Sequence, residues 1–429
     1  MKLDENLIKK ISDARGEPEW LLDWRLGALD IWRRMPEPHW GEVDYAPIDY
    51  DAIEYFGAAR PVDNSDLDAV YKKMNLPDAE RRALLGMATD TIIDSQSVHT
   101  SMTAELEKHG IIFLPFSEAV RRHPDLVREN IGSVVGPADN FFAALNAAVF
   151  SDGTFVFVPA NVKCPIDLAS YFRIETAKIA QFERTLIIAE PGAALTYMEG
   201  CSAPRRPAHQ LHSGVVEVIA RAGSVVKYAT VQNWSDNIYN FVTKRARADA
   251  DAAVYWTQLE IGSAKTWKYP STILAGARAF SDFYSLAITR GSQQADTGTR
   301  MIHIAPGTKS VVRSFGVALG NSRQTFRSLV RFAAQGCANA SNCDSKIIGA
   351  AATANTIPVF EGEGEIGNYS HEAKTGALDA AALLYLASAG IKETESAALL
   401  VAGIAAPVLS RLPMEFLVES KQLIQLAME

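Results

Sequence analysis

The chain has 429 residues, of which 48% are hydrophobic and 21% are charged. This ordinary globular balance can fill a large core, and the length suits two or three domains or one long solenoid with caps. Lys and Arg number 42 against 50 Asp and Glu, which gives a net charge of −8. These values exclude the basic face that a nucleic-acid-binding protein needs.

The N-terminus and the cysteines indicate the compartment. The sequence begins "MKLDENLIKKISDARGEPEW", without an apolar stretch or a cleavage site of small residues, so we expect no secretory signal. No apolar run reaches the roughly 20 residues that span a bilayer, so we expect no membrane partner. The four cysteines lack the dense spacing of a disulfide framework. We therefore expect a cytoplasmic protein with reduced cysteines.

Residues 1–135 are predicted to form an N-terminal helical region. In residues 17–35 large apolar side chains recur at three- and four-residue steps, and Pro36 and Pro38 end this helix. Further helices are expected at residues 78–90, 101–110 and 116–130.

Residues 136–368 are predicted to form a β core. Short alternating apolar runs are broken by Gly, Asn, Asp and Ser, and helical periodicity is nearly absent. A unit of strand, glycine corner and strand recurs around Gly192, Gly223 and Gly307. Such repeated units favour a parallel β-solenoid, with a large β-sandwich as the alternative.

Residues 369–429 are predicted to form a C-terminal helical region. Helical patterns cover residues 377–390 and 392–412, and Pro413 opens a third. These helices can cap the exposed end of a solenoid, or they can provide a docking surface.

Cys343, His371 and Glu372 form the first candidate site. A thiolate, an imidazole and a carboxylate suit a thiophilic metal or a nascent iron–sulfur cluster better than hydrolysis. Residues 28 apart can lie on neighbouring coils of a solenoid, and another subunit must supply further ligands. The alternative is that Cys343 is a small buried apolar residue and that His371 and Glu372 lie on a solvated loop.

Cys201 is the second candidate, as a thiol that accepts or relays sulfur. This role requires thiolate character from a nearby positive charge, and Lys244 can supply it if its side chain points inward. Gln232 and Trp234 alternate on one strand and therefore share a face. The alternative is a core cysteine, a surface lysine and an ordinary solenoid strand.

Other motifs carry little chemistry. Cys164 and Cys337 are expected to be structural or exposed, and His303 is expected to be a satisfied strand histidine. No phosphate-binding loop, nucleophile elbow or zinc-protease motif occurs in a suitable context. Any energy-dependent step would therefore have to be run by a partner.

The order of motifs resembles the SufB scaffold subunits of the SUF iron–sulfur cluster assembly system, within the SufBD family. The resemblance covers nearly the whole chain. It rests on "GEPEWLLDWRLGAL", "NFFAALNAAVFSDGTFVFVP", "YMEGCSAP", "QNWSDNIYNFVTKRA", "QQADTGTRMIHIAPGTKS", "CDSKIIG", "SHEAKTG" and "LPMEFLVESKQLI".

The resemblance implies a mostly β fold, a right-handed parallel β-helix with helical regions at both ends. It implies a complex with a SufD-like paralogue, which pairs with the β-helix, and a SufC-like ATPase, which docks on the C-terminal helices. A cysteine desulfurase with a sulfur-transfer protein would deliver persulfide sulfur. A transient [4Fe-4S] or [2Fe-2S] cluster would then pass to apo iron–sulfur acceptors.

The resemblance also assigns residues. Cys201 matches the sulfur acceptor, and Gln232, Trp234 and Lys244 match residues that line the sulfur route. Cys343 matches the cluster cysteine, and Glu372, beside His371, matches a carboxylate co-ligand.

Departures from the family pattern leave alternatives open. A SufD-like subunit typically has Gly at position 372, so Glu372 favours the scaffold over the partner. A cysteine-rich insertion common in SufB chains is absent after residue 56, Glu175 replaces a usual Asn, and Cys337 is additional. A SufD-like partner subunit, and less plausibly a polysaccharide-acting β-helix enzyme, remain the alternatives.

Overall fold

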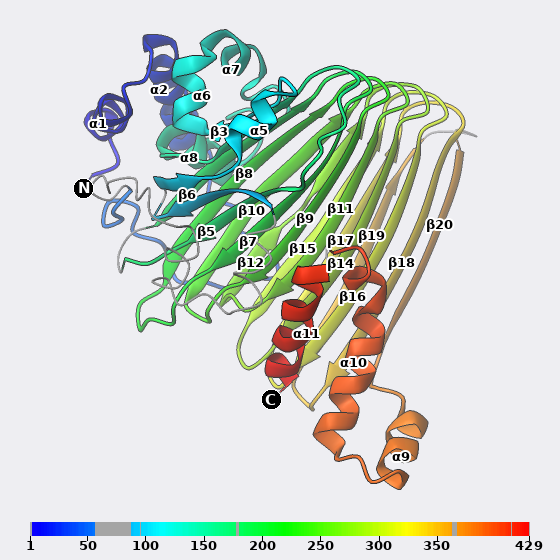
Figure 1. Cartoon of the computed structure of the whole chain (residues 1–429). Coiled ribbons are helices and arrows are strands. Elements are labelled where there is room, and N and C mark those ends of the chain that lie inside the picture. Colours follow the sequence, from blue (N-terminus) through cyan, green and yellow to red (C-terminus); the bar gives the residue numbers. More distant parts are fainter. Residues whose placement is uncertain are drawn as a thin grey trace.

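The computed structural model describes residues 2–55, 87–94, 96–176, 180–362, 367–412 and 414–428. In these residues the chain forms a β-solenoid of about seven turns, with helices before and after it in the sequence (Figure 1). The predicted mostly β fold and the solenoid are therefore confirmed. No helix in the described segments is long and apolar enough to cross a membrane.

Two sheets form the walls of the solenoid, and successive strands alternate between them. Nearly all neighbours pair in parallel, and the antiparallel pairs β1–β2 and β3–β4 lie at the N-terminal end. Parallel neighbours of this kind distinguish a solenoid from a sandwich of antiparallel sheets. The first sheet contains, in spatial order, β2 (Gln96–Thr100), β1 (Ala88–Ile93), β5 (Leu168–Arg173), β7 (Ala194–Ser202), β9 (Val225–Asn233), β11 (Ala253–Ile261), β14 (Phe280–Thr289), β16 (Lys309–Leu319), β18 (Cys337–Ile348) and β20 (Gly367–Gly376). The second contains β19 (Thr353–Glu361), β17 (Arg323–Phe332), β15 (Gln294–His303), β13 (Ser271–Leu274), β12 (Lys265–Lys268), β10 (Ile238–Ala248), β8 (Gln210–Ala220), β6 (Gln181–Ala189), β4 (Thr154–Val158) and β3 (Ile112–Pro115).

The corner glycines allow the sheets to close into coils. Gly192, Gly223 and Gly307 have φ values of 72°, 68° and 69°, in the left-handed region that side chains with a Cβ rarely adopt. The amide of Gly192 donates to the carbonyl of Ala222 on the next coil, and that of Gly223 donates to Ala250. The predicted strand–corner–strand unit is therefore confirmed at these positions.

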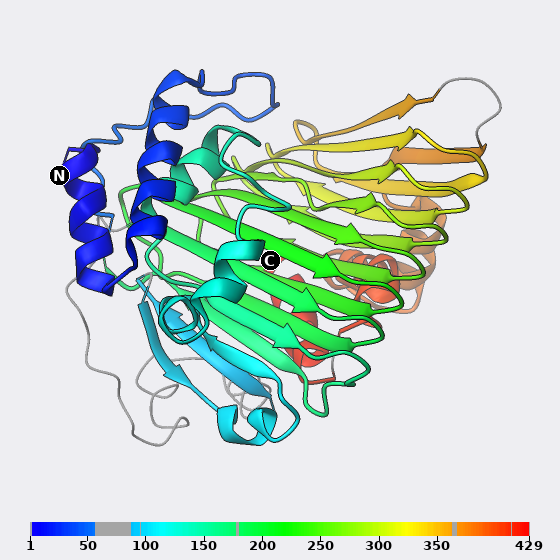
Figure 2. The ribbon, with the colours of Figure 1, turned by 90° about the horizontal axis from the view of Figure 1, so that it is seen from above.

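The N-terminal helices cover part of the outer face of the second sheet (Figure 2). They are α1 (Glu5–Arg15), α2 (Glu19–Arg34), α6 (Phe116–Arg122), α7 (Pro124–Asn130) and α8 (Phe141–Val149), whereas the short α5 (Thr103–Glu107) packs Leu106 against the interior core. The expected helix in residues 17–35 is confirmed, whereas the one in 116–130 is two helices. They are separated at His123, where the following Pro124 disfavours a helical backbone.

The helix predicted at residues 78–90 is wrong where it can be judged. Residues 78–86 lie outside the described residues, and the segment from Ala88 belongs to strand β1. Every residue of β1 is buried, and its partner β5 supplies parallel backbone hydrogen bonds. Tertiary pairing therefore overrides the local helix propensity of this segment.

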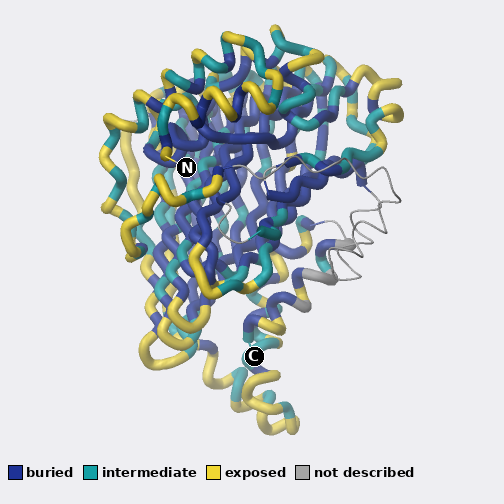
Figure 3. The backbone as a smooth tube through the Cα atoms, turned by 90° about the vertical axis from the view of Figure 1, so that its left-hand side faces the viewer, coloured by how far each residue is buried: buried dark blue, intermediate teal, exposed yellow. Residues whose placement is uncertain are grey.

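The C-terminal helices are α9 (Ala380–Ser388), α10 (Glu393–Leu409) and α11 (Met414–Met428). Val401, Val408 and Ile424 pack against the outer face of the first sheet, whereas α9 projects away from it (Figure 1). Strand β20 continues to Gly376, so the predicted boundary at residue 369 falls inside a strand. In the tube view the solenoid strands are mostly buried, and the projecting C-terminal segment is largely exposed (Figure 3).

Candidate functional site

Cys201 faces the interior of the solenoid, between the two sheets. Cys201 is 1% exposed, and its Sγ lies 3.7 Å from Oε1 of Glu199 and 3.8 Å from Nε2 of Gln232. Gln232 lies directly opposite Cys201 on the next coil, because β7 and β9 pair in parallel. The structure therefore brings together two residues that the sequence selected.

A chain of polar side chains extends from Gln232 across the interior. Gln232 Oε1 accepts from Asn240 at 2.5 Å, and Asn240 Oδ1 lies 2.7 Å from His212 Nδ1. The other ring nitrogen of His212 contacts the Glu183 carboxylate. The ring of Trp234 lies 4.7 Å from that of His212, so Trp234 also points inward.

Lys244 is fully buried and lies beside this network. Its Nζ donates to Glu199 at 2.6 Å and to Thr230 Oγ1 at 2.9 Å, and it lies 4.7 Å above the ring of Tyr228. Burial alone would raise the pKa of Glu199, but Lys244, Lys268 and the Tyr228 hydroxyl lower it to about 2. Burial lowers the pKa of Lys244 to about 8, against the raising effect of Glu199. At neutral pH the two residues form a charged pair.

The expectation that Lys244 makes Cys201 a thiolate needs correction. Lys244 points inward, but its charge is matched by Glu199, which is also next to the sulfur. Burial, followed by the negative charges of Glu199 and Glu183, raises the pKa of Cys201 well above its usual value. At neutral pH Cys201 is therefore a protonated thiol and not a thiolate.

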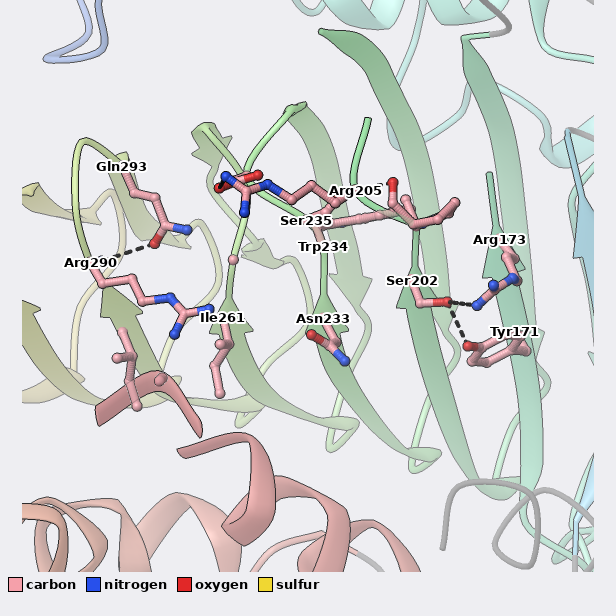
Figure 4. A pocket seen from close by; sticks show the side chains of 16 residues that line it. Tyr171, Arg173, Ser202, Arg205, Asn233, Trp234, Ser235, Ile261, Arg290 and Gln293 are labelled. Carbon is pink, nitrogen blue, oxygen red and sulfur yellow. Dashed lines mark hydrogen bonds and ion pairs between the residues drawn. The ribbon is translucent and has the colours of Figure 1, made fainter. Parts of the chain in front are cut away.

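A cavity of about 350 Å³ lies on the outer side of the strand ends next to Cys201 (Figure 4). Ser202 and Asn233 line it, whereas the preceding residues Cys201 and Gln232 face the interior. Trp234 lines the cavity as well, and it therefore lies between the outside and the His212 network.

Three arginines, Arg173, Arg205 and Arg290, surround the same cavity. Arg173 is ion-paired with Glu175, the residue that departs from the family pattern, and donates to Ser202 at 3.1 Å. Asp236 also lines the cavity and is ion-paired with Arg205 at 3.0 Å, so the lining keeps a smaller excess of positive charge directly outside Cys201.

Cys343 faces the interior near the far end of the solenoid. Cys343 is 2% exposed, and its Sγ lies 3.7 Å from Nε2 of His371 on β20. Burial raises the pKa of Cys343 to about 12, and Arg313 opposes this shift. Burial also lowers the pKa of His371, which favours the neutral ring that binds metals.

Glu372 is not brought to Cys343. It lies opposite Asn342 in the strand register, and alternate residues point to opposite faces of a sheet. Its exposed carboxylate accepts from Lys374 at 3.0 Å and from Asn342 at 3.3 Å, on the outer face. Cys343 and His371 form one predicted pair, and Glu372 lies on the other side of the same sheet.

A row of polar side chains joins the two ends of the interior. In-register pairing places Glu199, Thr230, Gln258, Ser285, Ser314 and Cys343 on successive strands of the first sheet. All are at most 7% exposed, and Ser285 donates to Ser314 at 3.2 Å. Five strand spacings and a two-residue offset separate Cys201 from Cys343 by roughly 25 Å.

Two family models match this chain. The SufBD core domain of the SUF system for iron–sulfur cluster assembly matches residues 172–404, and the SufBD N-terminal region matches residues 84–168. The chain belongs to the SufBD family. This membership places it in iron–sulfur cluster assembly and in the SUF system.

Relatives in the SufBD family are similar over the whole of this chain. An iron–sulfur cluster assembly SufBD family protein of Synechocystis sp. is 46% identical, and 93% of its length is covered. A chloroplastic SufBD family protein of Arabidopsis thaliana is 42% identical with 80% covered, and one of Staphylococcus epidermidis is 39% identical with 93% covered.

In this SufBD chain the strand edge near Cys343 is exposed. Strands β19 and β20 end their sheets, and Val359 and Phe360 on β19 are 42% and 43% exposed. In the described segments no group of three His, Cys, Asp or Glu side chains is close enough to hold a metal ion. Cys343 and His371 therefore lie beside an edge that another sheet can extend.

Sequence reasoning did not identify Glu199, His212, Glu183 and Asn240. Their strands were recognised, but the register that puts them beside Cys201 and Lys244 was not. The detectable signal was a charged or polar residue at an inward position of a strand, because such a residue requires a partner.

His303 gives a prediction for stability in acid. Its ring nitrogens lie 2.9 Å from Thr308 Oγ1 and 2.8 Å from Ser310 Oγ, and burial lowers its pKa from 6.5 to about 4. Between these values the unfolded chain binds more protons than the folded chain, so stability falls as pH falls. The full loss is about 3 kcal/mol.

Acid denaturation of His303→Gln and the parent protein tests this prediction. The variant is expected to lose less stability between pH 6.5 and 4 than the parent. His39→Gln, at an exposed histidine, is the control and should follow the parent curve. If His303→Gln loses as much stability as the parent between pH 6.5 and 4, His303 is not the group that causes the loss in acid.

Proposed function

We propose that this SufBD protein is a SufB-type scaffold on which persulfide sulfur, reduced to sulfide by two electrons from an electron donor outside this chain, combines with iron into a cluster. The observation that carries the proposal is the buried polar row between Glu199, beside Cys201, and Cys343. A core position is normally apolar, so a continuous polar row through a solenoid interior requires a reason beyond stability.

Sulfur is proposed to enter at Cys201. The thiolate of Cys201 attacks the outer sulfur of a donor persulfide, the donor S–S bond breaks, and the donor leaves as a thiolate that takes up the proton lost by Cys201. The basic cavity of Figure 4 suits a negatively charged persulfide group, and Trp234 separates this cavity from the interior. Gln232 and Lys244 line the next part of the route.

The cluster is proposed to form at Cys343 and His371, as cargo that is later released to apo-proteins. These two ligands are incomplete in the single chain, and the exposed edge strands β19 and β20 offer a surface for a SufD-like subunit that supplies the rest. Glu372 can join the same ligand set only if pairing with that subunit reorients β20, since it lies on the outer face.

The energy-dependent step is proposed to belong to a SufC-like ATPase and not to this chain. Leu384 and Tyr385 on α9 are 72% and 73% exposed, and α10 packs directly on the first sheet. Exposed apolar residues on a projecting helix suit a docking surface. A cytoplasmic location is proposed because all four cysteines are free thiols.

The alternative role is that of the SufD-like partner subunit. The scaffold is favoured because one polar row begins at Glu199, beside Cys201, and ends at Cys343. The polysaccharide-acting alternative lacks support, because the polar groups of the row are buried and do not line an exposed groove.

A plug in the polar row tests the proposed function. Ser285→Leu places a bulky apolar side chain halfway along the row, and Ser285→Ala is the matched control that removes only the hydroxyl. In the co-expressed complex, Ser285→Leu is expected to keep persulfide on Cys201, measured by mass spectrometry, and to lose most iron and sulfide. Normal cluster content in a folded Ser285→Leu complex contradicts the route.

A further inference from the structure

A second cavity, of about 420 Å³, lies on the outer face of the second sheet. It is bounded by the segment after α2, the start of α8 and strands β10, β12 and β15. It shares no lining residue with the cavity of Figure 4 and contains none of the residues of the proposed sulfur route.

Aromatic rings form most of the walls of this cavity. The ring centroid of Trp40 lies 4.9 Å from that of Trp267 and 5.7 Å from that of Tyr269. The ring centroids of Phe142 and Phe241 are 4.6 Å apart. Trp40 is 53% exposed although it belongs to this cluster. A half-exposed tryptophan at the rim of an aromatic cavity is available to a flat ligand.

Two arginines line the same cavity. Arg245, Ser271 and Arg300 occupy the same register position on β10, β13 and β15, so two strand spacings, roughly 10 Å, separate the arginine backbones. Arg245 donates to Asp139 at 2.5 Å and to Ser271 at 3.3 Å, and its Nε is buried without a partner in the described part of the chain.

Arg300 is the arginine of the cavity that lacks a directly bonded acid, although the Asp139 charge still attracts it from a distance. Among the described residues its guanidinium has no side-chain hydrogen bond or ion pair, and Asp139, the one acid in the cavity lining, is taken by Arg245. Burial, followed by repulsion from Arg245, lowers the pKa of Arg300. A partly buried cation without a partner is costly, and an anion placed between the arginines relieves this cost.

The first turn of α8 adds to the positive potential. Asn140 caps this nine-residue helix and also lines the cavity. Helix N-termini carry a partial positive charge, so the helix, Arg245 and Arg300 all favour an anion over a neutral ligand.

We propose that this cavity binds a small planar aromatic anion of at most about mononucleotide size. The ring is held among Trp40, Trp267 and Phe142, and the phosphate or carboxylate is held by Arg300, with the positive charge of the neighbouring Arg245 beside it. The occupant is a small molecule and not a protein segment, because the volume of the cavity, about 420 Å³, falls within the range of small-molecule sites.

Isothermal titration calorimetry on the full chain tests this proposal, with AMP and indole-3-acetate as the phosphate and carboxylate probes. Adenosine and indole lack the charge, and inorganic phosphate lacks the ring. At least one aromatic anion is expected to bind at least tenfold more tightly than its uncharged counterpart and than phosphate. Whichever probe binds identifies the preferred anionic group.

Variants locate the site. Arg300→Met is expected to weaken binding of the anion at least tenfold, and Trp40→Ala is expected to weaken it several-fold. The control Arg331→Met removes an exposed arginine of the same sheet, outside the cavity, and should leave binding unchanged. Circular dichroism verifies that each variant is folded. If Arg300→Met does not fold, the binding affinity of Trp40→Ala tests the proposal, because a change at a half-exposed position should leave the fold intact. The proposal is overturned if neither anion binds up to about 1 mM, if uncharged probes or phosphate bind equally well, or if folded variants bind as the parent does.

Discussion

Cys343→Ala, in a complex of this SufBD protein co-expressed with SufC-like and SufD-like partners, is expected to abolish retention of iron and sulfide. Cys343 is the one thiol next to His371, and alanine offers no metal ligand in its place. Anaerobic purification followed by iron and sulfide analysis and Mössbauer spectroscopy measures the result. Normal cluster content in Cys343→Ala contradicts the proposed site.

Cys337→Ala is the matched control for this experiment. Cys337 is also a buried thiol of β18, but it lies six residues away, roughly 20 Å along the strand, and contacts the Ala334 carbonyl at 3.1 Å. Its loss is expected to leave cluster content near that of the parent complex. Equal losses in the two variants indicate a general defect of the strand.

Glu372→Ala separates two arrangements of the edge strand. Because the carboxylate lies on the outer face with Lys374, we expect a smaller loss of cluster than for Cys343→Ala. A loss as complete as that of Cys343→Ala shows that β20 turns when the partner subunit pairs with it. The isolated chain and the complex then differ in the orientation of this strand.

Lys244→Met is expected to give the largest loss of folding stability, about 3–5 kcal/mol. Methionine keeps most of the volume but leaves the Glu199 carboxylate buried without its cationic partner. Urea denaturation followed by circular dichroism measures the change. Lys227→Met, at an exposed lysine of strand β9 in the opposite sheet, is the control and should be close to neutral.

The double variant Glu199→Gln with Lys244→Met separates stability from function. Removing both charges is expected to restore most of the stability, because a neutral buried pair needs no charge compensation. Persulfide loading of Cys201, measured by mass spectrometry, is expected to remain impaired if the pair also serves the sulfur route. If the double variant has the stability of the parent and loads persulfide on Cys201 normally, the Glu199–Lys244 pair has only a structural role.

The fold was predictable from the sequence because its signals are local. Short apolar runs with glycine corners require only period-two alternation and positive φ angles, and both are properties of a few adjacent residues. Cys201 and Cys343 could be selected in the same way, as isolated thiols in the strand-rich part of the sequence. The segment from Ala88 was misread because its burial depends on β5, some 80 residues later.

Length, charge and the order of motifs were enough to determine a β-solenoid of the SufBD family and to select its two principal thiols. Only the tertiary structure decided which residues surround them. The register between coils, set by the corners, pairs Lys244 with Glu199, lines up Ser285 and Ser314 with Cys343, and turns Glu372 outward. A shift of one residue between strands moves every side chain to the opposite face, so spacing along the sequence cannot specify these contacts.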